Sequence, residues 1–309
     1  MAENERVHTH GVFTHARRRW GFAVFCALMA AIISVLVLSP VRPKEAIAAK
    51  GGRATGGQEP PAQDGPRERP GPRAGLGTPD LPSPRRISAA LHRIAELGEP
   101  VYCGGGTRPL VALTFDDGPG PYTQETLSVL RDHGMTATFF LVGKLLGEGR
   151  FAWLPHSEAA LGAVGDHTWD HVPVVGLSRS GLQDQIARTR QAVARDVDAA
   201  VSLFRPPLGQ HDTAVDSYVR SLGMVEVLWS VDTQDSVGAN ADRIVRNVRR
   251  GLSPGDIVLL HENRGTTQLA LPRILRIIRS RGYRTVTVPQ LLARDPPSVH
   301  QLRTHTCPA

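Results

Sequence analysis

Two adjacent carboxylates follow a short run of strand-forming residues, in the stretch VALTFDDGPG at residues 111–120. Consecutive side chains of a strand point to opposite faces, so Asp116 and Asp117 are not expected to share one task. The Gly-Pro-Gly sequence that follows turns the chain, which lets both carboxylates reach one cavity from different directions. One acid could then bind a metal while the other moves protons, although an isolated Asp-Asp pair is more often a solvated strand end.

A pair of histidines lies in the stretch DHTWDH at residues 166–171. His167 and His171 are four residues apart, and one helical turn would place both imidazoles on the same side. Two histidines and one carboxylate, with an open fourth position, are a common catalytic zinc set. An isolated His-x3-His pattern often arises by chance, so it is the combination with a strand-end acid that favours a metal site.

Three further clusters stand at or just after the ends of strand-like runs. Arg205 precedes two prolines, which favours extended geometry and could project the guanidinium into a cleft, although a rigid surface loop is the alternative. Asp232 and Asp235 follow the next run, where ordinary helix capping competes with a functional role. His261 ends an apolar run; a lone histidine there is usually structural, but histidine is also the natural acid or base near neutral pH.

Strand-like and helix-like runs alternate from about Cys103 onward, and this alternation predicts a parallel α/β architecture. Apolar spacing predicts one helix from Leu182 and another over Ala241–Arg250. Roughly six or seven strand–helix units suit a barrel, with an open sheet as the alternative, and active sites of barrels lie at the carboxyl ends of their strands. The strand-like runs are Val111–Phe115, Ala137–Val142, Leu203–Phe204, Val225–Val231, Ile257–Leu260 and Thr285–Val288.

The N-terminal region carries an uncharged apolar segment, Trp20–Leu38, about as long as the ~20 residues that span a bilayer. Arg17, Arg18 and Arg19 precede it, which favours a cytoplasmic N-terminus. Ala46-Ile47-Ala48 resembles a signal peptidase site, but the apolar run exceeds the usual ~7–15 residues of a signal peptide core. We therefore expect a single-pass membrane anchor with the rest of the chain extracytoplasmic, or a secreted protein if the segment is cleaved.

The chain divides into five predicted regions. Residues 50–86 are dense in Gly, Pro and Arg and lack the apolar residues of a core, which predicts a disordered, semi-extended linker. A short amphipathic helix over Ile87–Leu97 could lead into the domain. The regions are a cytoplasmic tail (1–19), a transmembrane anchor or signal peptide core (20–39), a Pro/Gly/Arg-rich linker (40–100), a globular domain (101–295) and a C-terminal tail (296–309).

Charge and cysteine content add two expectations. The net charge is +7, almost all of it from arginine, and no basic patch interleaved with aromatic residues argues for nucleic acid. Of the three cysteines, Cys26 lies in the apolar segment and is interpreted as a packing residue. Cys103 and Cys307 flank the globular domain in a compartment where disulfides persist, so we predict that they pair and fasten the C-terminal tail.

Taken together, TFDDGP, HTWDH, RPPLG, VDTQDS and LLH resemble, in order, the five motifs of polysaccharide deacetylases of the NodB-homology type, carbohydrate esterase family 4. The resemblance covers about Val101 to Leu292. It implies a distorted (β/α) barrel that removes N- or O-acetyl groups from sugars. The metal ligands that it implies are Asp117, His167 and His171, which would hold a divalent cation, usually zinc, with cobalt as the alternative.

The resemblance also implies the remaining roles at the site. Asp116 would be the general base, and Arg205 would pair with it and hold it in place. Asp232 would orient and tune His261, the general acid. By the same analogy, the backbone N–H of Leu208 would face the oxyanion, and Leu259 would contact the acetate methyl group.

Two departures from the family pattern concern the sugar groove. The chain has Leu208 where an aromatic residue is usual in the third motif, and Ser236 where the fourth motif usually ends in Trp. Neither supplies a proposed catalytic side chain, so their loss bears on the substrate. An anchor and a linker would hold the domain within a cell wall, which favours peptidoglycan N-acetylglucosamine. Chitin-type oligosaccharides and acetylated xylan are the alternatives, and a catalytically weak sugar-binding module is the alternative from a different class.

Overall fold

The computed structural model describes residues 81–147, 151–197 and 201–308. The expected cytoplasmic tail, the apolar segment at 20–39 and the linker up to residue 80 lie outside these ranges, as does Cys26. Among the described residues, no helix has both the length and the apolar composition needed to cross a membrane.

One sheet of eight strands forms the centre of the domain, and each paired strand runs parallel to its neighbour. The strand order is β5-β4-β3-β2-β1-β7-β6, and β8 pairs with β1. The register places Asp116 of β1 beside His261 of β7, so both reach the same carboxyl edge. The strands are β1 (Leu110–Gly118), β2 (Thr138–Leu141), β3 (Ala163–Asp166), β4 (Leu203–Phe204), β5 (Val225–Glu226), β6 (Val231–Asp232), β7 (Ile257–His261) and β8 (Arg284–Thr285).

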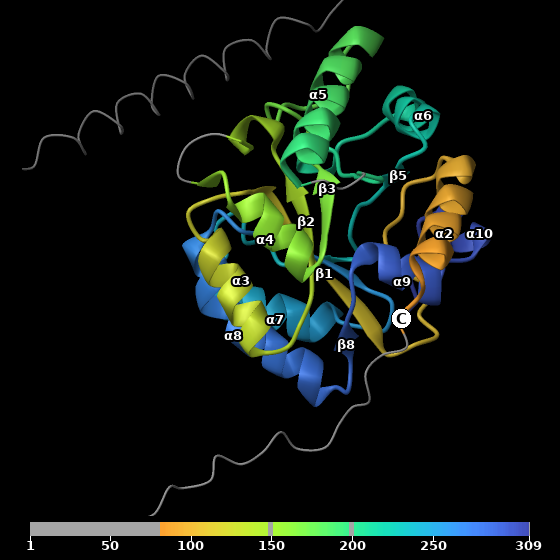
Figure 1. Ribbon diagram of the computed structural model, residues 1–309. Helices are drawn as coiled ribbons and strands as arrows, with labels where there is room; N and C mark the ends of the chain where they lie inside the picture. The colour runs from red at the N-terminus through yellow and green to blue at the C-terminus, as the bar shows by residue number, and fades with distance from the viewer. Residues whose placement is uncertain (1–80, 148–150, 198–200, 309) are drawn as a thin grey trace, which may run out of the picture. The chain divides into compact units, whose positions relative to one another are not determined.

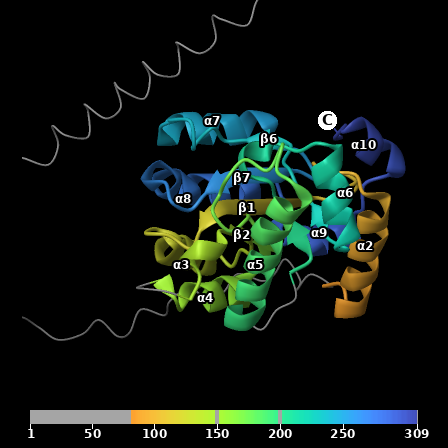
Figure 2. The ribbon, with the colours of Figure 1, turned by 90° about the horizontal axis from the view of Figure 1, so that it is seen from above.

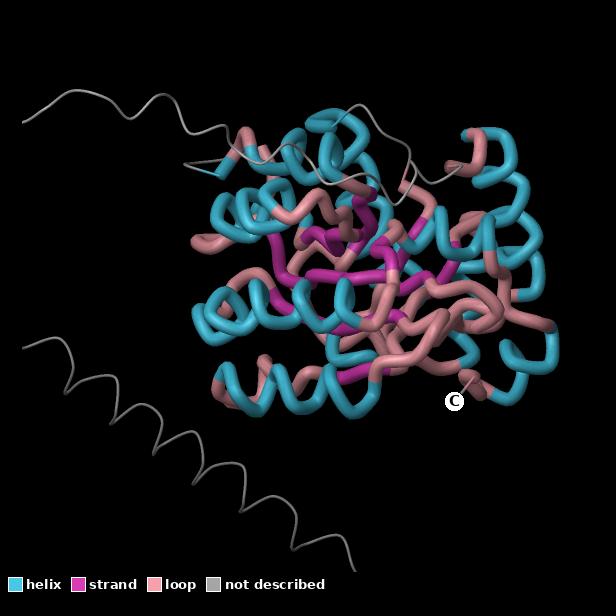
Figure 3. Tube along the Cα trace, turned by 90° about the horizontal axis from the view of Figure 1, so that it is seen from below, coloured by secondary structure: helices cyan, strands magenta, loops and turns pink. Residues whose placement is uncertain are grey.

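Chain connectivity requires this sheet to curve. The two ends of the row, β5 and β6, are consecutive in the chain and are joined by residues 227–230. If the seven strands of the row β5-β4-β3-β2-β1-β7-β6 lay flat, its ends would be roughly 29 Å apart. A connection this short spans at most about 17 Å. The row therefore bends toward a barrel, with the strands enclosed by helices (Figures 2 and 3). The predicted parallel α/β class is confirmed.

Amphipathic helices cover the sheet (Figure 1). In α7, Ile244, Val245 and Val248 are buried at helical spacing, and Asn240 caps the first turn by accepting a hydrogen bond from Arg243 N. Helix α7 packs beside α8, and α2 packs beside α9. The helices are α2 (Pro84–Leu97), α3 (Thr123–Asp132), α4 (Leu154–Leu161), α5 (Arg179–Val197), α6 (Thr213–Ser221), α7 (Ala241–Gly251), α8 (Gly265–Ser280), α9 (Val288–Arg294) and α10 (Val299–Thr304).

The strands differ from the sequence-based prediction in three places. The run Val225–Val231 is two short strands, β5 and β6, rather than one. The run predicted at Thr285–Val288 ends at Thr285, because Thr287 and Gln290 form a capping box that starts α9. Strand β3 was not predicted, since it is only four residues long and Ala and Gly make up half of it.

The N-terminal boundary of the domain also differs. Helix α2 falls within the region assigned to the linker at 40–100, yet its residues Ala90, Leu91, Ile94 and Ala95 are buried. Leu91, Ile94 and Ala95 join a hydrophobic cluster that includes Leu291 of α9. The segment from Pro84 therefore belongs to the folded domain.

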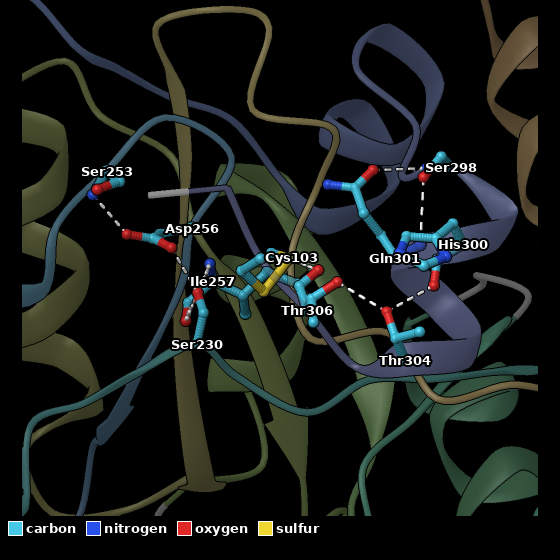
Figure 4. The surroundings of a disulfide bond; sticks show 11 residues. Cys103, Ser230, Ser253, Asp256, Ile257, Ser298, His300, Gln301, Thr304 and Thr306 are labelled. Carbon is cyan, nitrogen blue, oxygen red and sulfur yellow. Dashed lines mark hydrogen bonds between the residues drawn. A yellow bond between two sulfur atoms is a disulfide. The ribbon is translucent and has the colours of Figure 1, made fainter.

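The C-terminal tail is fastened to the domain by a disulfide. Cys103 and Cys307 are bonded, with their Cα atoms 5.9 Å apart. Figure 4 shows the surroundings of this bond, including the capping box of Ser298 and Gln301 that begins α10. The tail at 296–309 thus contributes a helix and a covalent link to the fold.

Candidate active site

Asp116 is held in place by a buried arginine. Its Oδ1 accepts a hydrogen bond of 2.7 Å from Arg205 Nη1, and the two side chains are 4% and 0% exposed. Arg205 also donates Nε to Val227 O, Nη1 to Thr114 Oγ1 and Nη2 to Leu228 O. Burial lowers the pKa of Arg205, while the neighbouring Asp116 charge opposes that shift. The network fixes the carboxylate and leaves Arg205 little freedom to move away.

A β-bulge explains how two adjacent acids reach one cavity. The pairing of β1 with β2 shifts register between Asp116 and Gly118, and Asp117 lies there at φ 69°. Aspartate is one of the few residues that adopt this left-handed conformation readily. Asp117 Oδ2 accepts a hydrogen bond of 2.9 Å from Asn263 Nδ2, which leaves Oδ1 to face the histidines.

The histidine pair is brought together by a loop, so the expected helical turn is wrong. Residues 167–174 contain no helix, and Thr168 and His171 have φ of 68° and 58°. Asp166 Oδ1 accepts a hydrogen bond from Thr168 N, and Thr168 Oγ1 accepts one from His171 N. These bonds stabilise the compact loop that directs both rings inward.

Both imidazoles face Asp117. His171 Nε2 lies 3.1 Å from Asp117 Oδ1, and His167 Nε2 lies 3.7 Å from the same oxygen. His167 Nδ1 donates a 2.7 Å hydrogen bond to the carbonyl of Arg205, which directs its Nε2 toward the cavity. Burial lowers the pKa of His167 and so favours the neutral ring that a metal ligand needs.

These three residues fit a divalent transition metal. One ligand atom from each of Asp117, His167 and His171 lies within 4.8 Å of the others. A tetrahedral ion with bonds near 2.0–2.1 Å places its ligand atoms about 3.3 Å apart, close to the observed separations. Asp117 Oδ1 is buried and has no hydrogen-bond partner, as expected of an oxygen that awaits a cation.

His261 is paired with Asp235. His261 Nδ1 donates a 2.8 Å hydrogen bond to Asp235 Oδ1, and His261 N donates a 2.7 Å bond to Oδ2. Thr267 Oγ1 donates a third bond, to Oδ2. Burial by itself would lower the pKa of His261, but the Asp235 hydrogen bond and the nearby charges of Asp116 and Asp235 raise it overall. The ring therefore keeps its proton to a higher pH than a free histidine.

The role assigned to Asp232 is wrong. Its side chain is exposed, and its Oδ1 accepts a hydrogen bond of 2.7 Å from Gln234 N. Gln234 has φ 62°, so the chain turns immediately after β6. This turn carries the later carboxylate, Asp235, to His261, whereas Asp232 only stabilises the turn.

The two leucines predicted to contact the substrate differ in solvent exposure: Leu208 is exposed and Leu259 is buried. Leu208 belongs to a 3₁₀ turn over Pro207–Gly209, with φ 61° and 64% of the residue exposed. Leu259 is 4% exposed and lies two residues before His261 on β7. A pocket of about 720 Å³ is lined by Asp235 and Ser236, so the position where the family usually has Trp borders open space.

Two buried carboxyl groups, Glu158 and Glu262, were not identified from the sequence. Burial raises the pKa of both, that of Glu262 to about 7. Thr123 Oγ1 donates a hydrogen bond to Glu262 Oε2. A Cβ at position 118 would lie 1.6 Å from Glu262 Oε1, so glycine is required there. The only sequence signal for Glu262 was its place directly after His261, the last residue of the buried strand β7.

The fold and the site together define a curved α/β domain in which a candidate metal site of one aspartate and two histidines lies beside a histidine–aspartate pair. The polysaccharide deacetylase family model matches residues 104–227. PgdA, a peptidoglycan-N-acetylglucosamine deacetylase of Listeria monocytogenes, is 32% identical over 226 residues, or 69% of this chain and 47% of that protein. A peptidoglycan-N-acetylglucosamine deacetylase of Bacillus cereus is 36% identical over 190 residues, or 59% of this chain and 88% of that protein.

A solved structure is similar as well. The crystal structure of a CE4 family pseudoenzyme from Bacillus anthracis has 28% sequence identity and a TM-score of 0.59, and covers 65% of this chain and 70% of that one. The chain belongs to the polysaccharide deacetylase family. Its match spans about half of the Listeria relative, 47% of that protein's length.

Proposed function

We propose that this protein is a metal-dependent hydrolase that removes N-acetyl groups from an extracytoplasmic polysaccharide, with peptidoglycan N-acetylglucosamine as the preferred substrate. The observation that carries the proposal is the convergence of three parts at one sheet edge: the Asp117/His167/His171 set, the Arg205–Asp116 pair and the Asp235–His261 pair. The substrate follows from the two relatives that are peptidoglycan-N-acetylglucosamine deacetylases.

Asp116 acts as the general base. A zinc or cobalt ion held by Asp117, His167 and His171 would polarise the acetyl carbonyl and make a bound water more acidic. Asp116 is not needed as a ligand, so it can accept the proton of the attacking water. Arg205 orients the Oδ1 of Asp116. The Oδ2 of Asp116 lies 3.7 Å from His167 Nε2 and so faces the candidate metal ligands.

His261 acts as the general acid. The leaving amine is too basic to depart unprotonated, so it needs a proton donor at the moment the C–N bond breaks. The Asp235 contact keeps His261 protonated and fixes its ring with Nε2 available for donation. The backbone N–H of Leu208 would face the oxyanion, and Leu259 would pack against the acetate methyl group.

The substrate assignment has two alternatives, chitin-type oligosaccharides and acetylated xylan. The open space beside Ser236 lacks the aromatic ring expected at that position, which would alter sugar stacking. A catalytically weak sugar-binding module is the alternative of a different class, and similarity to a pseudoenzyme is the reason to test it. The presence of the three candidate metal ligands, the general base and the general acid in one site favours an enzyme.

The proposed location rests on the sequence. The apolar segment Trp20–Leu38 would anchor the protein in the cell membrane, with the domain outside the cytoplasm, or would serve as a secretory signal. The Gly/Pro/Arg-rich stretch would then let the domain reach the wall polymer.

The test is acetate release by the purified full chain from peptidoglycan, N-acetylglucosamine oligomers and acetylated xylan, each with zinc and with a chelator. We expect zinc-dependent release, fastest from peptidoglycan, and none from Asp116→Asn. Preference for xylan would replace the amide assignment with an ester. No release from any substrate, with zinc bound at Asp117, would favour the binding module.

A further inference from the structure

We propose that His211, Asp216 and Glu226 form a second divalent-cation site, with a structural role, for a transition metal such as Zn²⁺. His211 lies in the loop before α6, Asp216 lies in the first turn of α6, and Glu226 ends β5. None of these residues takes part in the proposed catalysis. The site therefore goes beyond the proposed function.

The ligand atoms have the spacing of a metal site. His211 Nδ1 lies 3.0 Å from Asp216 Oδ1 and 3.9 Å from Glu226 Oε1. One ligand atom from each of the three residues lies within 4.8 Å of the others. These values bracket the roughly 3.3 Å between ligand atoms of a tetrahedral ion with bonds of 2.0–2.1 Å. One imidazole and two carboxylates suit zinc better than a hard cation such as Mg²⁺.

Glu226 is the observation that points to a bound ion. It is 4% exposed, and neither of its carboxylate oxygens has a hydrogen-bond partner among the described residues. A buried carboxylate without partners is costly and calls for a missing ion or water.

His211 has a second contact of the kind that supports a ligand. Its Nε2 lies 3.3 Å from the hydroxyl of Tyr102, so with Nδ1 on the metal the Nε2–H can donate to that oxygen. The ring of His305 lies 4.9 Å from the Tyr102 ring and 6.5 Å from the His211 ring, between centroids. Tyr102 precedes Cys103 and His305 lies two residues before Cys307, so the disulfide helps to hold these two rings near His211.

The charge balance of the cluster favours a cation. Asp212 adds a third carboxylate nearby, and burial together with Asp216 and Asp212 raises the pKa of Glu226 to about 9. Without a cation, Glu226 would keep a proton while His211 pairs with Asp216. A bound Zn²⁺ would displace that proton and be held by both carboxylates. The competing state is thus a protonated Glu226 that shares a hydrogen bond with Asp216, with no metal bound.

A metal at this point would tie together segments that are distant in the sequence. The ligands come from the loop before α6, from helix α6 and from strand β5. Tyr102, which contacts His211, stands next to Cys103 of the disulfide. A cation that binds only the folded state raises its stability, and the gain grows with the logarithm of the free cation concentration once that exceeds Kd. Zinc should therefore raise the melting temperature even when the catalytic set is disabled.

The experiment measures zinc per chain in the full-length protein by elemental analysis after equilibrium dialysis at one fixed free zinc concentration. The variants are Glu226→Gln, Asp117→Asn and the matched control His92→Gln, an exposed histidine of α2 that pairs with Glu96. We expect Glu226→Gln to bind one zinc fewer than wild type and Asp117→Asn to lose a different one. The double variant should lose both, and His92→Gln should lose none. Zinc binding elsewhere in the chain is common to all variants and cancels in these differences.

The thermal readout separates this site from a merely structural cluster. Zinc should raise the melting temperature of Asp117→Asn and fail to raise that of Asp117→Asn/Glu226→Gln. If Glu226→Gln does not fold by circular dichroism, Asp117→Asn/His211→Gln is measured instead, with the same expected loss. Equal zinc content in wild type and the folded Glu226 or His211 variant would overturn the proposal. So would a melting temperature of Asp117→Asn that zinc leaves unchanged.

Discussion

Asp235 lies against His261 through two hydrogen bonds, one from the ring Nδ1 at 2.8 Å and one from the backbone N at 2.7 Å. The carboxylate thus fixes both the position and the tautomer of the histidine. Asp232, three residues earlier, stabilises the turn through Gln234 N and does not reach the ring. Replacing these two acids should therefore have different effects: replacing Asp235 should change activity and its pH dependence, and replacing Asp232 should leave the pH profile unchanged.

Asp235→Asn should slow turnover by about 10²-fold or more, since positioned acid–base groups contribute on that scale. The shift in pH dependence has a definite sign. His261 must carry a proton to act as an acid, and the Asp235 contact raises its pKa, so activity falls as pH rises through that raised value. Removing the charge lowers the pKa, and the alkaline limb of the kcat/KM profile should move to lower pH.

Asp232→Asn is the matched control for this experiment, because it changes the exposed acid of the same motif. Its pH profile should coincide with that of wild type. A displaced alkaline limb in Asp232→Asn, with an unchanged one in Asp235→Asn, would reverse the assignment.

Asp116→Asn and Asp117→Asn should separate proton transfer from metal binding. Asp116 is paired with Arg205, whereas the unpaired Oδ1 of Asp117 faces both histidines. We expect Asp116→Asn to retain its metal and to lose about 10²–10⁴-fold in kcat. Asp117→Asn should bind the catalytic metal much more weakly. Zinc titrations of both variants check this division, and equal loss of affinity in the two would contradict it.

The sequence predicted the parallel α/β class and most strands because long apolar runs such as that of β7 carry their own signal. It could not predict β3, whose four residues are held by neighbours rather than by their own propensity. Side-chain pairings across distant segments were harder still. Asp235 reaches His261 after a turn in which Gln234 adopts a positive φ, a detail of backbone geometry that spacing does not encode.

The local backbone conformation of the candidate metal ligands could not be predicted from the sequence either. The spacing of His167 and His171 suggested a helical turn, yet a loop with two positive φ angles achieves the same convergence. The residue types were therefore informative and the local conformation was not. Glu226 shows the opposite case, because nothing in its sequence context marks it, and only its burial without partners draws attention to it.

Arg205→Met should destabilise the domain, because it leaves the Asp116 carboxylate buried without its partner. Breaking a buried pair in this way costs about 3–5 kcal/mol, measured as the free energy of unfolding in urea. Arg205→Met/Asp116→Asn should recover part of that loss, since the uncompensated charge is gone. The control is Arg188→Met: Arg188 is half exposed beside Asp184 and lies over the Trp169 ring, and losing both contacts should cost about 2 kcal/mol or less. Similar losses in both single variants would show that Arg205 does not act through the buried charge.

Reduction of the Cys103–Cys307 bond should lower stability by about 2–4 kcal/mol, since the link closes a loop of most of the domain. Without reductant, alkylation of the unfolded full chain should modify only Cys26, and modification of all three cysteines would exclude the bond. Cys103→Ser/Cys307→Ser should have the lower melting temperature of the reduced protein and should not respond to reductant. Loss of the bond should also loosen His305 from Tyr102, because the end of the tail would then be held mainly by the packing of α10 through Leu302. A reductant effect of equal size in the double variant would trace the loss to something other than this disulfide.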